Sequence, residues 1–191
     1  MLGFLYSQLI LAPFHDNAAR QRWGICPFVQ NAFKNLDPRQ CLTGSSMKCV
    51  DSKIGRAVFS RLFEDEDLLE SIASTAKQND VDSGFFLLIG TLKKAVLGFY
   101  KEGKYVPIEK SGPLEIVSCT GNVSVKDDGE LVVHGHIVVG DSKGDAFGGH
   151  VLPGCFVDVT AELVLIEVEK GSLVRKFEPE RNLYLWALGR A

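Results

Sequence analysis

The sequence predicts an α+β fold, in which a mainly antiparallel, strongly curved sheet or half-open barrel packs around one principal amphipathic helix. Two observations carry this prediction. Several short segments rich in Val, Ile, Leu and Phe are separated by turn-forming residues, which is typical of consecutive antiparallel strands. Residues 68–79 alone repeat their apolar side chains convincingly with the period of an amphipathic helix. Many strands around one helix indicate an α+β domain.

The first strand and the helix are expected one after the other. Residues 54–62 mostly alternate apolar and polar side chains, as a half-buried strand does. The four carboxylates of residues 64–67 can cap a helix and complement its dipole. The helix is expected to end near Asn79, and its apolar side chains form one stripe: Leu68, Leu69, Ile72, Ala73 and Ala76.

The remaining segments are expected to be strands. The run at residues 84–92 is continuously apolar and too short for a buried helix, so we interpret it as a central strand covered on both faces. A hairpin partner is expected at residues 95–100, with residues 101–104 as a turn. Further strands are expected at residues 114–125, 131–139, 156–168 and 173–178, with turns at 127–129 and 170–171.

Residues 1–46 differ from the rest of the chain. Their first 14 residues are apolar, but ~20 are needed to cross a bilayer, and no basic residue precedes them as in a secretory signal. We therefore expect no membrane span and interpret 1–46 as an N-terminal extension, either disordered or upstream of a true start at Met47. A targeting or anchoring segment is the alternative. Residues 47–191 have the size of one domain.

The charge balance argues against a dedicated nucleic-acid binder. The chain has 21 basic and 24 acidic side chains and a net charge of −3. The first 46 residues hold four basic and two acidic side chains, so residues 47–191 hold 17 basic and 22 acidic ones and carry a charge near −5. A protein that binds the phosphate backbone needs an excess of cations, which this domain lacks.

The cysteines indicate a reducing compartment. The five cysteines, at positions 26, 41, 49, 119 and 155, form no CxxC pair and no even framework. Reduced thiols of a cytoplasmic protein explain this spacing better than a disulfide scaffold does.

Three of the four histidines lie within 17 residues and indicate a metal site. His134 and His136 are two apart on a predicted strand, so both imidazoles point to the same face. His150 follows a predicted turn, and a strand that returns beside the first would bring its ring to the same point. Three imidazoles leave a fourth position of a tetrahedral metal open. The alternative is that His134 and His136 are half-exposed on a strand and that His150 packs in a turn.

Other chemistry has weaker support. Glu162 is either a hydrogen-bond partner for an imidazole N–H or a solvated carboxylate. Ser118 and Cys119 have no GxSxG sequence around them, which argues against a catalytic nucleophile. No GxxxxGK[ST] phosphate loop occurs, and the glycines between 140 and 154 fit turns and bulges.

Six segments in order resemble one known family. They are GRAVFSRLFEDEDLLESI, DSGFFLLIGTLKKAVLGFY, EIVSCTGNVS, HGHIVV, GGHVLPGC and TAELVL. Together they resemble the plants-and-prokaryotes-conserved (PPC) domain, from Met47 to about Leu188. The resemblance implies an α+β sheet fold, a homotrimer as the self-association partner, and a DNA-binding label inherited from plant members. The HxH and GGH motifs are similar to the prokaryotic, stand-alone type, which implies that His134, His136 and His150 bind zinc or another divalent metal.

One feature of the plant members is absent from this sequence. Their PPC domain follows AT-hooks, whose arginines enter the A·T minor groove, and no Arg-Gly-Arg-Pro core occurs in these 191 residues. The best substitute for it is a basic patch in the predicted hairpin, which would have to gather on one face to attract DNA. The lysines of this patch are Lys93, Lys94, Lys101, Lys104 and Lys110.

Two functions therefore stay open. The first is a homotrimeric regulatory or DNA-binding module whose three histidines hold a structural or sensing metal. The second is a small metal-dependent enzyme or small-molecule-binding protein that uses the same site, with Glu162 or Asp141 as a base. The scarcity of acids and bases beside the histidines favours the first.

Overall fold

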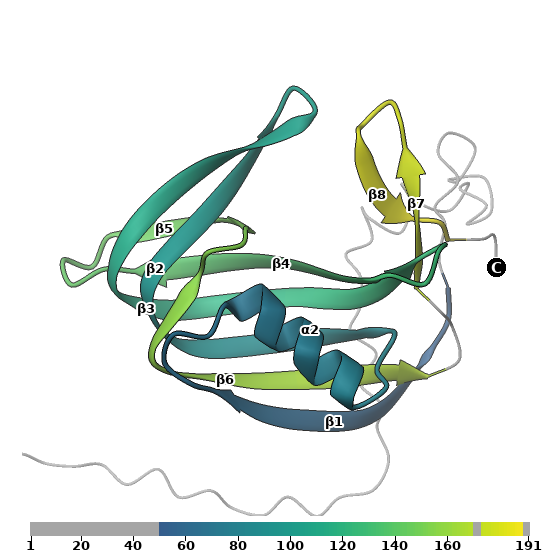
Figure 1. The fold of residues 1–191 in the computed structure, drawn as a ribbon, viewed down its shortest axis with the longest axis horizontal. Coiled ribbons are helices and arrows are strands. Elements are labelled where there is room, and N and C mark those ends of the chain that lie inside the picture. The colour runs from purple at the N-terminus through teal and green to yellow at the C-terminus, as the bar shows by residue number, and fades with distance from the viewer. Residues whose placement is uncertain (1–49, 170–172, 189–191) are drawn as a thin grey trace, which may run out of the picture. The chain divides into compact units, whose positions relative to one another are not determined.

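The computed structural model describes residues 50–169 and 173–188, and the extension predicted at residues 1–46 lies outside the described residues. Within these ranges the chain forms eight strands and one helix, shown in Figure 1. Their bounds are β1 (Lys53–Leu62), α2 (Leu68–Gln78), β2 (Gly84–Lys101), β3 (Lys104–Lys126), β4 (Leu131–Gly140), β5 (Ala146–Val151), β6 (Phe156–Glu169), β7 (Val174–Glu178) and β8 (Leu183–Trp186).

The strands form one sheet that curves back on itself. Its order is β1–β6–β2–β5–β4–β3–β7–β8, and β2 also pairs with β3. All these pairs are antiparallel except β3 with β7. β5 pairs with β2 only at Leu97 and Gly98, so the sheet is not a true barrel. The predicted curved, mainly antiparallel sheet with one helix is confirmed, although the described part is mostly strand.

Helix α2 covers one face of this sheet (Figure 1). Asp67 is its N-cap, because the Asp67 carboxylate accepts hydrogen bonds from the backbone N–H groups of Leu69 and Glu70 at 2.9 and 3.2 Å. The stripe predicted from the sequence turns Leu68 and Ile72 into the hydrophobic core, where both are at most 1% exposed. With 11 residues, this helix of the described ranges is too short to span a membrane.

Strand β2 differs from its prediction. Residues 84–101 form one strand, so the expected hairpin partner at 95–100 was wrong. The true partner is the first half of β3, which follows the turn predicted at 101–104. Bulges between Leu88 and Gly90 and between Leu92 and Lys94 bend the long strand. The sequence pattern also missed β8.

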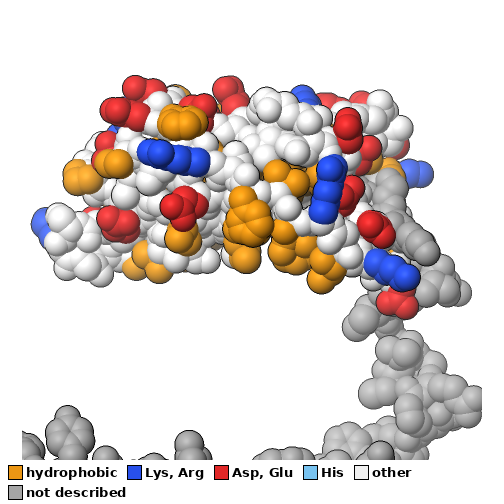
Figure 2. All heavy atoms as spheres, turned by 90° about the horizontal axis from the view of Figure 1, so that it is seen from below, with side chains coloured by type: hydrophobic (Ala, Val, Ile, Leu, Met, Phe, Trp, Pro, Cys, Tyr) orange, Lys and Arg blue, Asp and Glu red, His pale blue; other side chains and the backbone are white. Residues whose placement is uncertain are grey.

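One face of the sheet remains exposed in the single chain. Phe85, Leu87 and Ile89 point to this outer face and are 37%, 48% and 56% exposed, whereas Phe86 and Leu88 between them are buried. The expectation that this strand is covered on both faces was therefore wrong for one chain, because α2 packs against the opposite face. Figure 2 shows hydrophobic side chains gathered along the lower margin of the molecule and several acidic ones along the upper margin.

The strand register places the histidines on the same outer face. Leu87 of β2 pairs with Thr120 of β3, and Thr120 pairs with His136 of β4. Side chains of directly paired residues lie on the same side of a sheet. The exposed apolar residues of β2 and the imidazoles of β4 thus belong to one surface.

Candidate metal centre

A tight hairpin brings the three predicted histidines together. His134 and His136 lie two residues apart on β4, and His136 pairs directly with His150 on β5. Asp141 fixes the turn, because its Oδ1 accepts hydrogen bonds from the backbone N–H groups of Lys143 and Asp145 at 2.9 and 3.0 Å. The register of this hairpin therefore sets the imidazole positions.

The three rings surround one point. The nearest ring nitrogens of His134, His136 and His150 all lie within 4.8 Å of one another. The ring centroids are 5.1 to 5.4 Å apart. Ligands of a tetrahedral zinc lie about 3.3 Å apart, so the rings need only a small inward turn to share an ion.

Burial keeps two of the imidazoles neutral. Desolvation, with smaller contributions from Arg175 and His136, lowers the pKa of His134 to about 4. Desolvation followed by the neighbouring histidines and Arg175 lowers the pKa of His150 to about 4 as well. Both rings are therefore neutral at pH 7, which is the state that binds metals.

One buried nitrogen supports the fit to a metal. Nδ1 of His150 is buried and has no hydrogen-bond partner among the described residues. An unsatisfied buried polar atom costs free energy, and metal coordination would satisfy it. The donor set, three imidazole nitrogens with an open side, also suits zinc.

Arg175, which no sequence motif indicated, contacts the histidine cluster from β7. Its side chain is 6% exposed. Nη2 lies 3.4 Å from Nδ1 of His134 and donates a hydrogen bond to Oδ1 of Asn122 at 2.9 Å. Nε donates to Ser124 at 2.7 Å, and Nη1 donates to the carbonyl oxygen of Tyr184 at 2.9 Å. Only the pairing of β7 with β3 brings this residue near β4, so no local motif could have indicated it.

Tyr105 was missed for the same reason. Its ring stacks on that of His150, with centroids 4.2 Å apart and an interplanar angle of 12°. Tyr105 lies on the β2–β3 arm, which is the projecting hairpin formed by residues 95–110. The tip of this arm contacts the β7–β8 turn, since Tyr100 donates a hydrogen bond to the carbonyl oxygen of Arg181 and Asn182 donates one to that of Gly103. Two hairpin tips therefore meet beside the histidines.

Glu162 lies away from the histidine cluster. It faces the same side of the sheet, but it pairs with Arg61 of β1 and Ile89 of β2. Strands β2 and β3 separate β6 from this part of β4, which corresponds to about 14 Å at the usual strand spacing. The position favours the solvated carboxylate over the imidazole partner.

The five predicted lysines do not gather into one patch. Lys94 pairs with Glu109, and Lys93 pairs with Glu64 and Asp65. Lys110 lies over the ring of Phe147 at 3.6 Å. The two lysines at the tip of the arm, Lys101 and Lys104, pair directly in the register but lie seven or more residues from Lys94 along the arm.

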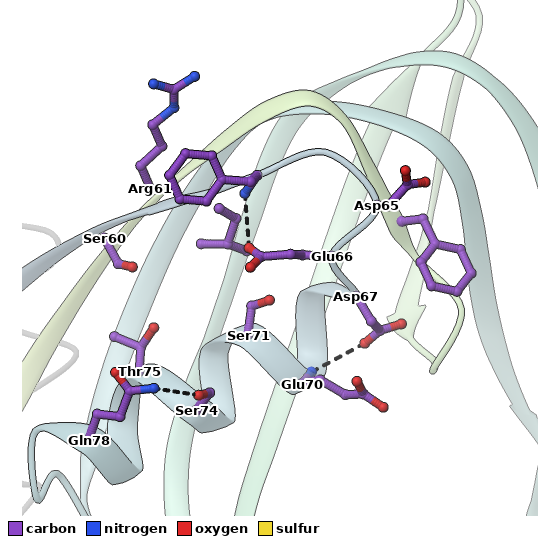
Figure 3. A pocket seen from close by; sticks show the side chains of 13 residues that line it. Ser60, Arg61, Asp65, Glu66, Asp67, Glu70, Ser71, Ser74, Thr75 and Gln78 are labelled. Carbon is purple, nitrogen blue, oxygen red and sulfur yellow. Dashed lines mark hydrogen bonds between the residues drawn. The ribbon is translucent and has the colours of Figure 1, made fainter.

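A separate cavity lies beside α2, as shown in Figure 3. It has a volume of about 440 Å³ and is lined by carboxylates and hydroxyls that include Glu66, Glu70 and Ser71. Two of its acids have structural roles: Asp67 caps α2, and Glu66 accepts a hydrogen bond from the backbone N–H of Phe63 at 2.9 Å. None of the three histidines lines this cavity.

Comparison with family models and curated proteins finds one domain. The model of the Plants and Prokaryotes Conserved (PCC) domain, the family abbreviated PPC above, matches residues 50–169. A bifunctional protein GlmU from a Synechococcus strain is 35% identical over 121 residues, which is 62% of this chain. The match spans only 18% of that relative.

Three solved structures share the fold. A PPC protein from Pyrococcus horikoshii has 33% identity and a TM-score of 0.68, covering 76% of this chain and all of the other. A metal-containing protein from Archaeoglobus fulgidus has 29% identity and a TM-score of 0.67, covering 73% of this chain and 99% of the other. A candidate DNA-binding protein from Ralstonia eutropha has 26% identity and a TM-score of 0.63, covering 78% and 100%.

Proposed function

Because the chain belongs to the Plants and Prokaryotes Conserved domain family, we propose that it is a homotrimeric regulatory module of the cytoplasm that holds a divalent metal ion. The ligands are His134, His136 and His150. One observation carries the proposal: three imidazoles converge within 4.8 Å, and a buried nitrogen of one has no other described partner.

Zinc fits this donor set best. Zinc accepts imidazole nitrogen in tetrahedral sites and, with three protein ligands, keeps one position for water or another ligand. When bound, it would supply a Lewis-acidic centre on the outer face of the sheet. The likeness to the metal-containing Archaeoglobus protein supports a metal of some kind.

Metal analysis of His136→Ala tests the site. We expect wild-type protein, stripped with a chelator and reloaded with zinc at pH 7, to retain stoichiometric zinc after desalting. His136→Ala should lose it, and the fold should survive because His136 is exposed. Thr120→Ala is the matched control, since Thr120 pairs with His136 across the strands but offers no imidazole. Wild-type protein without stoichiometric metal would contradict the proposal.

The exposed outer face supports the homotrimer. A single chain leaves Phe85, Leu87 and Ile89 of β2 in contact with water, together with Val138 of β4. Exposed apolar side chains gathered on one face are typical of a protein interface. Because the histidines share this face, self-association would also shield the metal from solvent.

Direct DNA binding is not part of this proposal. The Ralstonia neighbour is named for it, but residues 47–191 carry a net charge near −5. Four of the five predicted lysines have carboxylate or aromatic partners. We expect no binding of a short duplex at about 50 mM salt, measured by fluorescence anisotropy. Binding that weakens steeply between about 50 and 200 mM salt would contradict this expectation.

A metal-dependent enzyme or small-molecule-binding protein is the second candidate. It is favoured by two cavities beside the histidines: one of about 280 Å³ lined by Thr120 and His136, and one of about 330 Å³ lined by His134 and Arg175. Neither cavity is lined by Glu162 or Asp141, the bases considered from the sequence. Ligand binding therefore has more support than turnover.

A further inference from the structure

We propose that Arg175 and the metal centre together bind the oxyanion of a small organic ligand, in the cavity lined by Asn122, His134, Arg175, Leu185 and Trp186. This inference rests on the proposed function, because His134 belongs to both sites.

The positive charge of Arg175 is not neutralised by any carboxylate within the described ranges. The guanidinium is buried, and none of its partners within the described ranges is a carboxylate: they are a hydroxyl, an amide oxygen, a backbone carbonyl and an imidazole. A buried arginine is usually paired with an anion. The local surroundings therefore leave room for a negative partner from outside the chain.

Arg175 contacts His134 directly, at 3.4 Å between Nη2 and Nδ1. A guanidinium has only N–H donors, so Nδ1 of His134 must be the acceptor, and its proton then lies on Nε2. Coordination of a metal through Nδ1 would use that acceptor lone pair. Coordination through Nε2 would move the proton to Nδ1, so that the N–H groups of His134 Nδ1 and Arg175 Nη2 would point at each other. Either way, metal binding removes an acceptor from Arg175.

The cavity beside Arg175 has one charged end and one apolar wall. Its volume of about 330 Å³ suits a small molecule. Leu185 and Trp186 supply an apolar wall, and the Trp186 ring lies 5.6 Å from the Arg175 guanidinium carbon. A ligand with a carboxylate or phosphate at one end and a flat or apolar body satisfies both parts. The shared recognition feature is the oxyanion, which accepts hydrogen bonds from Arg175.

Calorimetric titration with benzoate and benzamide, a charged and a neutral probe of similar shape, tests the inference. Inorganic phosphate serves as a third probe. We expect benzoate or phosphate to bind and benzamide not to bind. Metal loading frees an N–H donor of Arg175 and adds positive charge, so the anion should bind more tightly to zinc-loaded than to metal-free protein. Because such coupling is reciprocal, the bound anion should also slow the loss of zinc.

Variants assign the effect to Arg175. Arg175→Gln should weaken anion binding about tenfold or more, as expected for loss of a charged hydrogen bond. Lys176→Gln is the matched control, because it removes one positive charge from the adjacent, exposed position. If Arg175→Gln is too unstable to test, a second variant replaces it. Trp23→Phe leaves Trp186, which lines the cavity, as the sole tryptophan. Benzoate should change the fluorescence of Trp186 in this variant, and benzamide should not.

Failure of this inference is distinguishable from failure of the metal site. Equal binding of benzamide and benzoate would overturn the inference, and so would unchanged binding by Arg175→Gln. Binding of neither anion in either metal state would also overturn it. A wild-type protein that holds no zinc but binds benzoate through Arg175 would overturn the metal proposal and the metal's part in this inference, and would leave Arg175 as the anion-binding residue.

Discussion

At the residue scale, the histidine cluster depends on two glycines that face each other. Gly121 of β3 pairs with Gly135 of β4, which lies between His134 and His136. A Cβ on Gly121 would collide with the carbonyl oxygen of His134 and would approach Cζ of the buried Phe86 ring to 2.5 Å. The missing side chains therefore let β3 and β4 pack closely against Phe86 directly beneath the imidazoles.

Gly121→Ala should destabilise the protein. We expect the free energy of unfolding to fall by about 1–3 kcal/mol, because an overpacked core must shift backbone or ring atoms. Urea denaturation followed by circular dichroism measures the change. Gly140→Ala on the next strand is the control, since its Cβ would meet only Val117 at 3.5 Å, and it should stay within about 0.5 kcal/mol of wild type. Equal stability of the two variants would show that the close approach is unimportant.

At the element scale, α2 is tied to the segment that follows the histidine hairpin. Asp67 caps the helix through Oδ1, and its Oδ2 accepts a hydrogen bond from the backbone N–H of Gly154 at 2.6 Å. The backbone N–H of Leu68 also donates to the carbonyl oxygen of Cys155 at 3.0 Å. One carboxylate thus joins the start of the helix to the loop between β5, which carries His150, and β6. Figure 3 shows its bond to Glu70.

Asp67→Ala removes all these side-chain bonds at once. We expect a loss of about 1–2 kcal/mol for the helix cap alone, with a further loss from the part-buried N–H of Gly154. A lower midpoint in thermal denaturation measures it. Asp82→Ala, which removes an exposed carboxylate after the same helix, should leave the midpoint nearly unchanged. A cap variant as stable as this control would contradict the role assigned to Asp67.

At the scale of the whole molecule, the two faces of the sheet have different environments. The inner face packs Phe86, Leu88 and Ile137 into the core, where each is at most 2% exposed. The outer face exposes apolar side chains of β2 beside the histidines of β4. A second copy of the chain is the partner that the proposed homotrimer supplies for this outer face.

Leu87→Glu should disrupt that assembly. A carboxylate buried in an apolar interface without a partner is costly, whereas in a single chain it would be solvated. Light scattering should give three times the 21.0 kDa chain mass for wild type and a lower mass for the variant. Phe63→Glu is the control, because Phe63 is 58% exposed beside the α2 cavity. A wild-type monomer, or a Leu87→Glu trimer, would contradict the proposed assembly.

Much of the fold follows from local patterns in the sequence. The stripe from Leu68 to Ala76 predicted the helix, and the acidic run before it contains the cap. Alternation predicted β1, and apolar segments bounded by turn residues predicted β4, β6 and β7, all to within a few residues. The order of six family segments predicted membership of the family that matches residues 50–169. These features depend on neighbours in the chain, so residue spacing alone determines them.

The rest depends on which strands pair. The spacing of His134 and His136 puts them on one face, but only the β4–β5 register brings in His150. The pairing of β7 with β3 brings Arg175 to His134, and the bend of β2 leads the Tyr105 arm to His150. The sequence by itself determined most of the elements, the family and the three candidate ligands. Only the tertiary structure decided their charged and aromatic neighbours, because those contacts join residues far apart in the chain.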